Sequence, residues 1–342
     1  MGSYFQRVSR LTPTRMWVNN VTPRQARLGI EAGAVGCTQN PAYLSKILKA
    51  DPELTGRILD RWIAELKDDN EVLVRAQAEL VGLVAKEFLP MYEQTGGKAG
   101  FVTIQGSPFA ENTAEILRQA AIARAYGPNV MVKVPVIPAG IEAILHLARE
   151  GAPLCCTEVF ALRQAVDMGE ALLGVNPTAP IYLAHIAGIY DEFLQRQVAA
   201  GGIDICQDVL WHAGIAVAKK VYAIVKERKY PVEFLGGGAR GLHHFTEMVG
   251  ASAYVTINWS GTAEQLIEQD PLVVQRFHMP TPQSVLDELL HKLPDFKRGY
   301  FADAIEPEEF EAFGPVALFR DSFEKGWQEA LNVISQRRET VR

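Results

Sequence analysis

Eight short runs of strand-forming residues alternate with amphipathic helical stretches along most of this 342-residue chain. Parallel strands need helical crossovers and burial on both faces, so eight such units predict an α/β fold that is a single closed (β/α)8 barrel of TIM type. The pattern changes near the end of the chain, which adds a C-terminal helical extension to the prediction. A doubly wound open sheet also alternates strands with helices and remains the alternative.

The predicted strands are apolar runs rich in Val, Ile, Thr and aromatic residues. In chain order they cover residues 16–19, 34–38, 101–105, 130–134, 154–159, 181–186, 232–235 and 254–258. Between them, apolar residues recur every three or four positions, which predicts helices. A long helix is expected from about Val72 to Leu89, ending at Pro90, and another from Val209 to Val225.

The domain prediction has two parts. Residues 1–280 are expected to form the barrel, and residues 281–342 a C-terminal extension packed on it. Beyond about Pro280, proline and acidic residues interrupt the alternation, and an amphipathic helix is expected over 318–334.

Composition narrows the class of protein. Hydrophobic residues make up 48% and charged residues 22%, which is enough apolar material for a sizeable core. Lys plus Arg is 34 against 40 Asp plus Glu, so no nucleic acid or anionic membrane is expected as partner. No apolar run reaches the roughly 18 residues of a membrane span. Four cysteines are too few for a disulfide framework. A soluble, cytoplasmic protein is expected.

In such a barrel, functional residues lie at the carboxyl ends of strands and in the loops that follow. This rule selects Asn19, Thr38–Pro41, Gln105, Lys133, Thr157 and the loop 236–240.

Lys133 is the most informative of these residues. It lies inside Val130–Val136, a run that is otherwise apolar, and strand alternation places it on one face with Met131 and Pro135. Burial lowers the pKa of a lysine, and a neutral amine is what imine formation with a carbonyl requires. A lysine at a strand end with its ammonium group in water is the structural alternative.

Gln105 and Thr157 come from neighbouring strand ends. An amide and a hydroxyl near a lysine could hold the water that adds to or leaves a carbinolamine. Each is also ordinary at such a position, because Thr is common in strands.

The segment Gly236-Gly-Gly-Ala-Arg-Gly241 follows the seventh predicted strand. Its glycines would let backbone N–H groups approach an anion, with Arg240 as a charged fork. The same letters satisfy GxGxxG, so a nucleotide-dependent oxidoreductase is an alternative. A dinucleotide site lacks support because no acidic residue follows at the expected distance of about 20 residues. A turn that needs positive φ is the structural alternative.

Histidines and cysteines do not predict a metal site. His243 and His244 are expected on a helix surface, since no acidic or cysteine partner stands at ligand spacing. His185 is expected to point into the helix layer as a core histidine. Cys155 and Cys156 are adjacent and are expected to be buried strand thiols.

Four segments, in this order, resemble the transaldolase family of class I aldolases, which includes the fructose-6-phosphate aldolases. They are Gly36-Cys-Thr-Gln-Asn-Pro41 (TTNP-like), Val132-Lys-Val-Pro135 with Ala139–Ala143 (the Schiff-base segment), Cys156–Phe160 with Gln164-Ala165 (TLxF…QA), and Phe234–Arg240 with Val255–Ile257 (a GASFR-like phosphate loop and an LTI strand). The similarity covers roughly residues 15 to 265.

The resemblance implies a role for each matching position. Lys133 would be the imine-forming nucleophile, and Thr157 would orient the catalytic water. Gln105 stands where transaldolases have glutamate and fructose-6-phosphate aldolases have glutamine. Asn40, with Thr38 beside it in the TTNP-like segment, would contact substrate hydroxyls. Arg240, with Gly238 in the same loop, would bind phosphate.

Several positions depart from the family pattern. Asn19 replaces an aspartate that acts as acid and base in C–C cleavage, and an amide cannot transfer that proton. Cys155 replaces an asparagine. Ala184 matches the aldolase branch, whereas Ile189 replaces a second phosphate-binding arginine. Together with the bulky Trp259 after the last strand, Ile189 suggests a substrate that is less charged or differently anchored than a standard sugar phosphate.

The expected function is a transaldolase-like transferase of carbohydrate metabolism, of the kind found in the pentose phosphate pathway. It would form a Schiff base at Lys133 and transfer a dihydroxyacetone-like unit. A lyase of the same class and a non-catalytic sugar-binding descendant are the alternatives. No cofactor or metal is expected. The expected partner is a small-molecule sugar or sugar phosphate, and a homodimer is left open.

Overall fold

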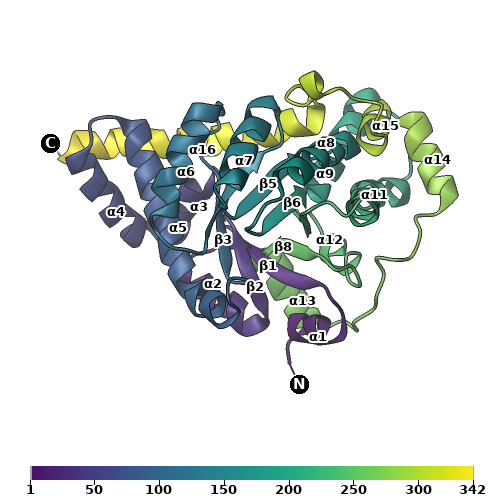
Figure 1. Cartoon of the computed structure of the whole chain (residues 1–342), viewed down its shortest axis with the longest axis horizontal. Helices are drawn as coiled ribbons and strands as arrows, with labels where there is room; N and C mark the ends of the chain where they lie inside the picture. Colours follow the sequence, from purple (N-terminus) through teal and green to yellow (C-terminus); the bar gives the residue numbers. More distant parts are fainter. Residues whose placement is uncertain (1, 342) are drawn as a thin grey trace.

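The computed structural model describes residues 2–341 and has a closed barrel of eight parallel strands (Figure 1). The closed ring β1-β2-β3-β4-β5-β6-β7-β8 confirms the predicted barrel, and the doubly wound alternative is wrong. Each strand starts and ends within one residue of its prediction. The strands are β1 (Arg15–Asn19), β2 (Ala34–Thr38), β3 (Phe101–Ile104), β4 (Val130–Pro135), β5 (Leu154–Val159), β6 (Ile181–His185), β7 (Glu233–Gly236) and β8 (Tyr254–Asn258).

Helices surround the strands. They are α1 (Tyr4–Leu11), α2 (Pro23–Ala32), α3 (Tyr43–Ala50), α4 (Pro52–Glu65), α5 (Asp69–Gln94), α6 (Thr113–Arg124), α7 (Pro138–Arg149), α8 (Leu162–Val175), α9 (Ala187–Gly201), α10 (Gln207–Leu210), α11 (Ala213–Glu227), α12 (His243–Thr246), α13 (Glu264–Gln269), α14 (Gln283–Lys292), α15 (Pro294–Tyr300) and α16 (Gly314–Val341). Two short helical segments, η1 (Trp259–Ala263) and η2 (Pro307–Glu309), complete the set.

Helix α5 does not end where the sequence suggested. Pro90 lies inside the helix, which continues to Gln94. A proline within a helix removes one backbone hydrogen bond. The following turn is nevertheless held by tertiary packing, because the ring of Tyr92 lies edge-on to that of Phe101 in β3, with ring centroids 5.3 Å apart.

The inside of the barrel is layered along its axis. Four aromatic side chains, one each from β1, β3, β6 and β8, pack together with ring centroids 4.9 to 6.4 Å apart. They are Trp17, Phe101, Tyr182 and Tyr254. Gly36 makes room for this layer, since a Cβ there would collide with the Trp17 ring. Two residues further along the same strands, towards the carboxyl ends, stand Asn19, Thr103, Ala184 and Thr256, of which three are polar. The aromatic layer therefore forms an apolar floor beneath them.

The last helix crosses the carboxyl end of the barrel. Helix α16 packs against α3, α4, α5 and α9 and reaches β5. It runs along the upper edge of the molecule in Figure 1, on the opposite side from α1. Its apolar side, which includes Phe319, Phe323 and Trp327, is buried. It is longer at both ends than the predicted 318–334.

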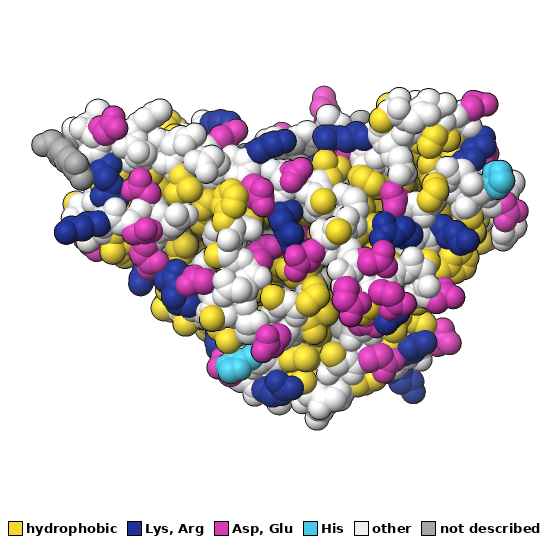
Figure 2. All heavy atoms as spheres, turned by 90° about the horizontal axis from the view of Figure 1, so that it is seen from above, with side chains coloured by type: hydrophobic (Ala, Val, Ile, Leu, Met, Phe, Trp, Pro, Cys, Tyr) yellow, Lys and Arg dark blue, Asp and Glu magenta, His cyan; other side chains and the backbone are white. Residues whose placement is uncertain are grey.

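Among residues 2–341 no helix is both long and apolar enough to span a membrane. On the face seen in Figure 2, acidic and basic side chains are interspersed.

Candidate active site

Lys133 lies in the middle of β4 and points into the barrel. The residue is 7% exposed, and its pairing partner across β4 and β5 is Cys155. Burial lowers the pKa of Lys133, and the nearby Cys155 and Glu158 only partly oppose that shift. On the side of helix α16, Nζ of Lys133 lies 6.0 Å from the ring centroid of Phe319 and 5.9 Å from that of Phe323. Lys133 is therefore a buried amine and does not end in water.

A cavity of about 220 Å³ opens beside Lys133 at the carboxyl ends of the strands. It is bounded by strand ends, by the loop after β7, by the start of α3 and by α16. The lining side chains include Asn19, Thr38, Asn40, Lys46, Lys133, Ala184, Ile186, Gly238, Arg240, Thr256, Asn258, Phe319, Ser322 and Phe323.

A hydrogen-bonded polar group lines one side of this cavity. The amide of Asn19 donates to Oδ1 of Asn258 at 3.0 Å, and its carbonyl oxygen accepts from the Thr38 hydroxyl at 2.9 Å. The hydroxyls of Thr38 and Thr256 lie 2.7 Å apart. Asn19 thus lines the cavity with both ends of its amide engaged, and a neutral amide is not a proton-transfer group.

Gln105 and Thr157 lie on either side of β4. Gln105 follows β3 and lines a second, smaller cavity of about 40 Å³ together with Lys133 and Glu111. Thr157 is fully buried on β5, paired with Pro135. Within the described residues, the hydroxyl of Thr157 and the side-chain oxygen Oε1 of Gln105 make no hydrogen bond. Buried polar atoms of this kind are costly to leave unpaired, so a polar molecule bound here would find ready partners.

The cations of the large cavity differ from those expected. Arg240 lines it, but its guanidinium is held by Glu192 at 2.7 Å. Lys46 on α3 also lines it, although the residue as a whole is exposed. Partial burial and then the charges of Arg240 and Lys133 lower the pKa of Lys46. Ile189 is buried, and its side chain would lie against a Cβ at Gly238, so it packs behind the loop and brings no charge to the cavity.

The loop 236–240 is shaped by Gly238 and fastened by His244. Gly238 has φ +69°, and a Cβ there would collide with Ile186, so the predicted requirement for glycine is real. Nδ1 of His244 accepts hydrogen bonds from the backbone N–H groups of Arg240 and Gly241, at 3.3 and 3.2 Å. Some of the loop's N–H groups are therefore already used within the protein.

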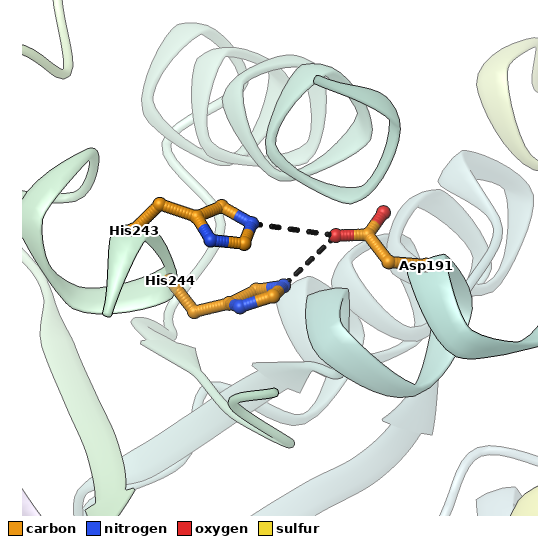
Figure 3. A group of neighbouring side chains, drawn as sticks. All are labelled: Asp191, His243 and His244. Atoms are coloured by element: carbon orange, nitrogen blue, oxygen red, sulfur yellow. Dashed lines mark hydrogen bonds and ion pairs between the residues drawn. The ribbon is translucent and has the colours of Figure 1, made fainter. Parts of the chain in front are cut away.

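The prediction of a surface position is wrong for His244, which is 3% exposed, whereas His243 is half-buried. Figure 3 shows both imidazole rings turned towards the carboxylate of Asp191. Nε2 of His244 lies 2.8 Å from the buried carboxylate of Asp191, and Nε2 of His243 lies 3.8 Å from it. Burial opposes ionisation of Asp191, but the two histidines outweigh it and lower its pKa. Asp191 was missed as a partner because it arrives from α9, about 50 residues earlier. One ligand atom from each of the three lies within 4.8 Å of the others, so they could hold a metal ion.

Three polar residues at or just beyond the end of β6 are turned away from the cavity, so none of them supplies a proton-transfer group beside Asn19. His185 points outward to the carbonyl of Gly214 in α11, as expected, and burial lowers its pKa to about 4. Tyr190 donates to the carbonyl of Asp295. Asp191 faces the two histidines.

The remaining predicted residues are placed as follows. Ala184 and Asn40 line the large cavity, and Oδ1 of Asn40 accepts from the backbone N–H of Ala42. Trp259 is buried in η1 and does not belong to the lining of either cavity that contains Lys133.

This geometry can be compared with known proteins. A model of the family described as transaldolase/fructose-6-phosphate aldolase matches residues 19–297. The chain belongs to the transaldolase/fructose-6-phosphate aldolase family. It is 28% identical to a transaldolase of Neisseria gonorrhoeae over 66% of this chain and 68% of that protein. It is 24% identical to transaldolase 1 of Streptomyces avermitilis, over 62% and 61%. A transaldolase of Thermobifida fusca is 23% identical over 98% of both chains.

Several residues near Lys133 were not predicted from the sequence. Glu158 and Glu111 are buried carboxyl groups close enough to Lys133 or to each other to affect pKa values. Glu158 could have been found by the argument applied to Lys133, because it too is a charged residue inside an apolar strand. Glu111, Lys46 and the aromatic residues of α16 lie outside the strands and carry no such signal.

Proposed function

We propose that this protein forms an imine between Lys133 and the carbonyl of a ketose-type substrate and transfers a dihydroxyacetone-like unit. The observation that carries the proposal is a buried lysine of lowered pKa, in a polar cavity of about 220 Å³, in a chain of this family. A neutral amine is the reactive form, and a dry site keeps it neutral.

The chemistry begins when Nζ of Lys133 attacks the carbonyl carbon to give a carbinolamine. Loss of water gives a protonated imine. Its positive nitrogen accepts the electron pair released when the bond between the α and β carbons breaks, while the β-hydroxyl gives its proton to a bound water molecule and the fragment leaves as an aldehyde. Gln105 and Thr157 would hold the water, and Asn19, Thr38 and Asn258 would bind substrate hydroxyls. An acceptor aldehyde then takes up the bound three-carbon unit.

The anchoring of the substrate is the altered part of the proposal. Ile189 offers no charge, and Arg240 must share its guanidinium with Glu192. Lys46 is the remaining cation at the cavity and would contact an anionic end of the substrate. We therefore infer a substrate that is anchored differently from a standard sugar phosphate.

The test is intact-mass analysis after borohydride reduction with dihydroxyacetone, fructose, fructose 6-phosphate and sedoheptulose 7-phosphate, followed by peptide mapping. An adduct on Lys133 that is lost in Lys133→Met supports the proposal. Lys49→Met is the matched control, because Lys49 is an exposed lysine on α3 outside the cavity lining. Absence of any adduct would instead favour a non-catalytic sugar-binding protein.

A lyase of the same class is the second candidate. Gln105 and Ala184 are the residues that the resemblance assigns to the aldolase branch. Incubation of the unreduced enzyme with a ketose donor, with and without an acceptor aldehyde, separates the two. Release of free dihydroxyacetone without acceptor indicates a lyase, whereas release only as a new ketose indicates a transferase.

A further inference from the structure

Strand β5 is irregular next to Thr157. Cys156 pairs with Leu183 of β6 and Val159 with His185, so two residues of β5 oppose the single residue Ala184. Glu158, inside this bulge, has φ +59°, a left-handed conformation that few residues other than glycine adopt. Bulges beside active sites redirect a side chain that regular alternation would send elsewhere. The residue redirected here is a glutamate.

One oxygen of the Glu158 carboxyl group is held by a hydrogen bond, and the other has no partner within residues 2–341. The residue is fully buried. Its Oε1 accepts a hydrogen bond from Nε2 of Gln105 at 2.8 Å. Its Oε2 makes no hydrogen bond within residues 2–341. Gln105 follows β3 and Glu158 belongs to β5, so their bond spans β4, the strand that carries Lys133.

Glu158 and Lys133 affect each other's protonation. Burial raises the pKa of Glu158, with Gln105 and Lys133 opposing, and burial lowers the pKa of Lys133, with Glu158 among the opposing groups. Both shifts favour a neutral acid beside a neutral amine. That combination has the same number of protons as an ion pair of the two groups.

A route leads from this pair towards the surface. Lys133, Gln105 and Glu111 line the cavity of about 40 Å³, which has room for a water molecule. Burial and then the charge of Glu158 raise the pKa of Glu111 to about 8, against the opposing charge of Arg320. Arg320 lies 3.1 Å from Glu111 and cannot relay a proton, but the side chain of Glu111 is itself 11% exposed and so reaches solvent directly.

We propose that Glu158 is the acid–base residue of imine formation at Lys133, with Glu111 as the group through which it exchanges protons with solvent. This rests on the proposed function. As the amine attacks, Glu158 protonates the carbonyl oxygen, which becomes the carbinolamine hydroxyl. The proton that the attached nitrogen loses is passed to this hydroxyl, and the C–O bond breaks to release water. A neutral amine, a neutral acid and a ketone thus give a protonated imine, a carboxylate and water, and Glu158 becomes the counter-ion of the imine.

The experiment measures the rate of imine formation with fructose 6-phosphate and with dihydroxyacetone, by borohydride quenching at intervals and intact mass. Four proteins are compared across pH 5.5–9.5: wild type, Glu158→Gln, Glu111→Gln and the double variant Gln105→Glu/Glu158→Gln. The double variant keeps an amide–carboxyl hydrogen bond and moves the acid to the other side of β4. Glu308→Gln, at an exposed position, is the matched control.

Glu158→Gln is expected to slow imine formation by about 100-fold and to remove the fall in rate at alkaline pH, where wild-type Glu158 loses its proton. The double variant is expected to recover much of the rate, and Glu111→Gln to slow it less. A Glu158→Gln variant with the wild-type rate and pH profile would overturn the proposal while leaving the proposed function intact. A loss that the double variant does not recover, with the alkaline fall unchanged, would also overturn it, because it would indicate a packing role. Failure of the wild type to trap any substrate would instead remove the proposed function itself.

Discussion

Nζ of Lys133 lies 5.9 Å from the ring centroid of Phe323, so a side chain of the last helix covers an amine of the fourth strand. These residues are nearly 200 positions apart in the sequence. The aromatic ring lies on the side where the barrel is open and adds to the burial that lowers the pKa of Lys133.

Phe323→Ala is therefore expected to raise the pKa of Lys133 towards its usual value. Imine formation at pH 7 should slow, and its pH midpoint should move upward. The variant should also lose about 3 kcal/mol of stability, as for other buried phenylalanines. Ile334→Ala, a fully buried residue on the same helix, is the control for stability alone. An unchanged pH midpoint in Phe323→Ala would mean that the ring does not desolvate the amine.

Lys133→Met is expected to make the protein more stable, by about 1 kcal/mol at pH 7, because burying an amine costs free energy that a methionine does not. The unfolded chain binds a proton at Lys133 up to about pH 10, and the folded chain releases it at lower pH. Wild-type stability from this group therefore rises with pH, and the advantage of Lys133→Met should shrink between pH 7 and pH 9.5. Urea unfolding at the two pH values measures both. An advantage that grows with pH would contradict the lowered pKa.

Glu111→Gln tests a pH dependence of stability opposite in sign to that of Lys133. The pKa of Glu111 is raised to about 8, so the folded state holds a proton that the unfolded state has lost above about pH 4.5. The wild type loses stability from this group as pH rises from there to about 8. Relative to the wild type, Glu111→Gln should gain more than about 1 kcal/mol between pH 5 and pH 8. Glu308→Gln should show no such trend in urea unfolding. A constant difference would show that Glu111 ionises at its ordinary pH.

Glu192→Gln should release the guanidinium of Arg240 for an anionic substrate. Exposed ion pairs are weak, so an effect of about threefold is expected. KM for fructose 6-phosphate should fall by that factor at low salt, while KM for fructose stays the same. Equal changes for both sugars would show that Arg240 does not contact the phosphate.

The eight strands could be predicted from the sequence because each is a short local run of strand-forming residues, and local pattern is sufficient for such elements. The inward placement of Lys133 followed from the same alternation. The end of α5 could not be predicted, because the packing of Tyr92 on Phe101 sustains the helix past Pro90.

The candidate site was predictable only where it lies on the strands. Asn19, Thr38, Lys133 and Ala184 line the cavity because strand ends converge in a barrel. Lys46 and Phe323 are brought to it by helix packing, which no spacing in the sequence reveals. His244 was placed wrongly for the same reason, since its partner Asp191 lies on another helix.

Helix α16 forms one wall of the cavity, and this has a consequence for how the protein is synthesised. A barrel can fold as its strands leave the ribosome, but residues 319–323 are made long after the eighth strand. A chain that ends before residue 319 would lack this wall, and Lys133 would be open to water on that side, where solvation favours the protonated amine. The part of the site that shields the lysine is therefore the last to be synthesised.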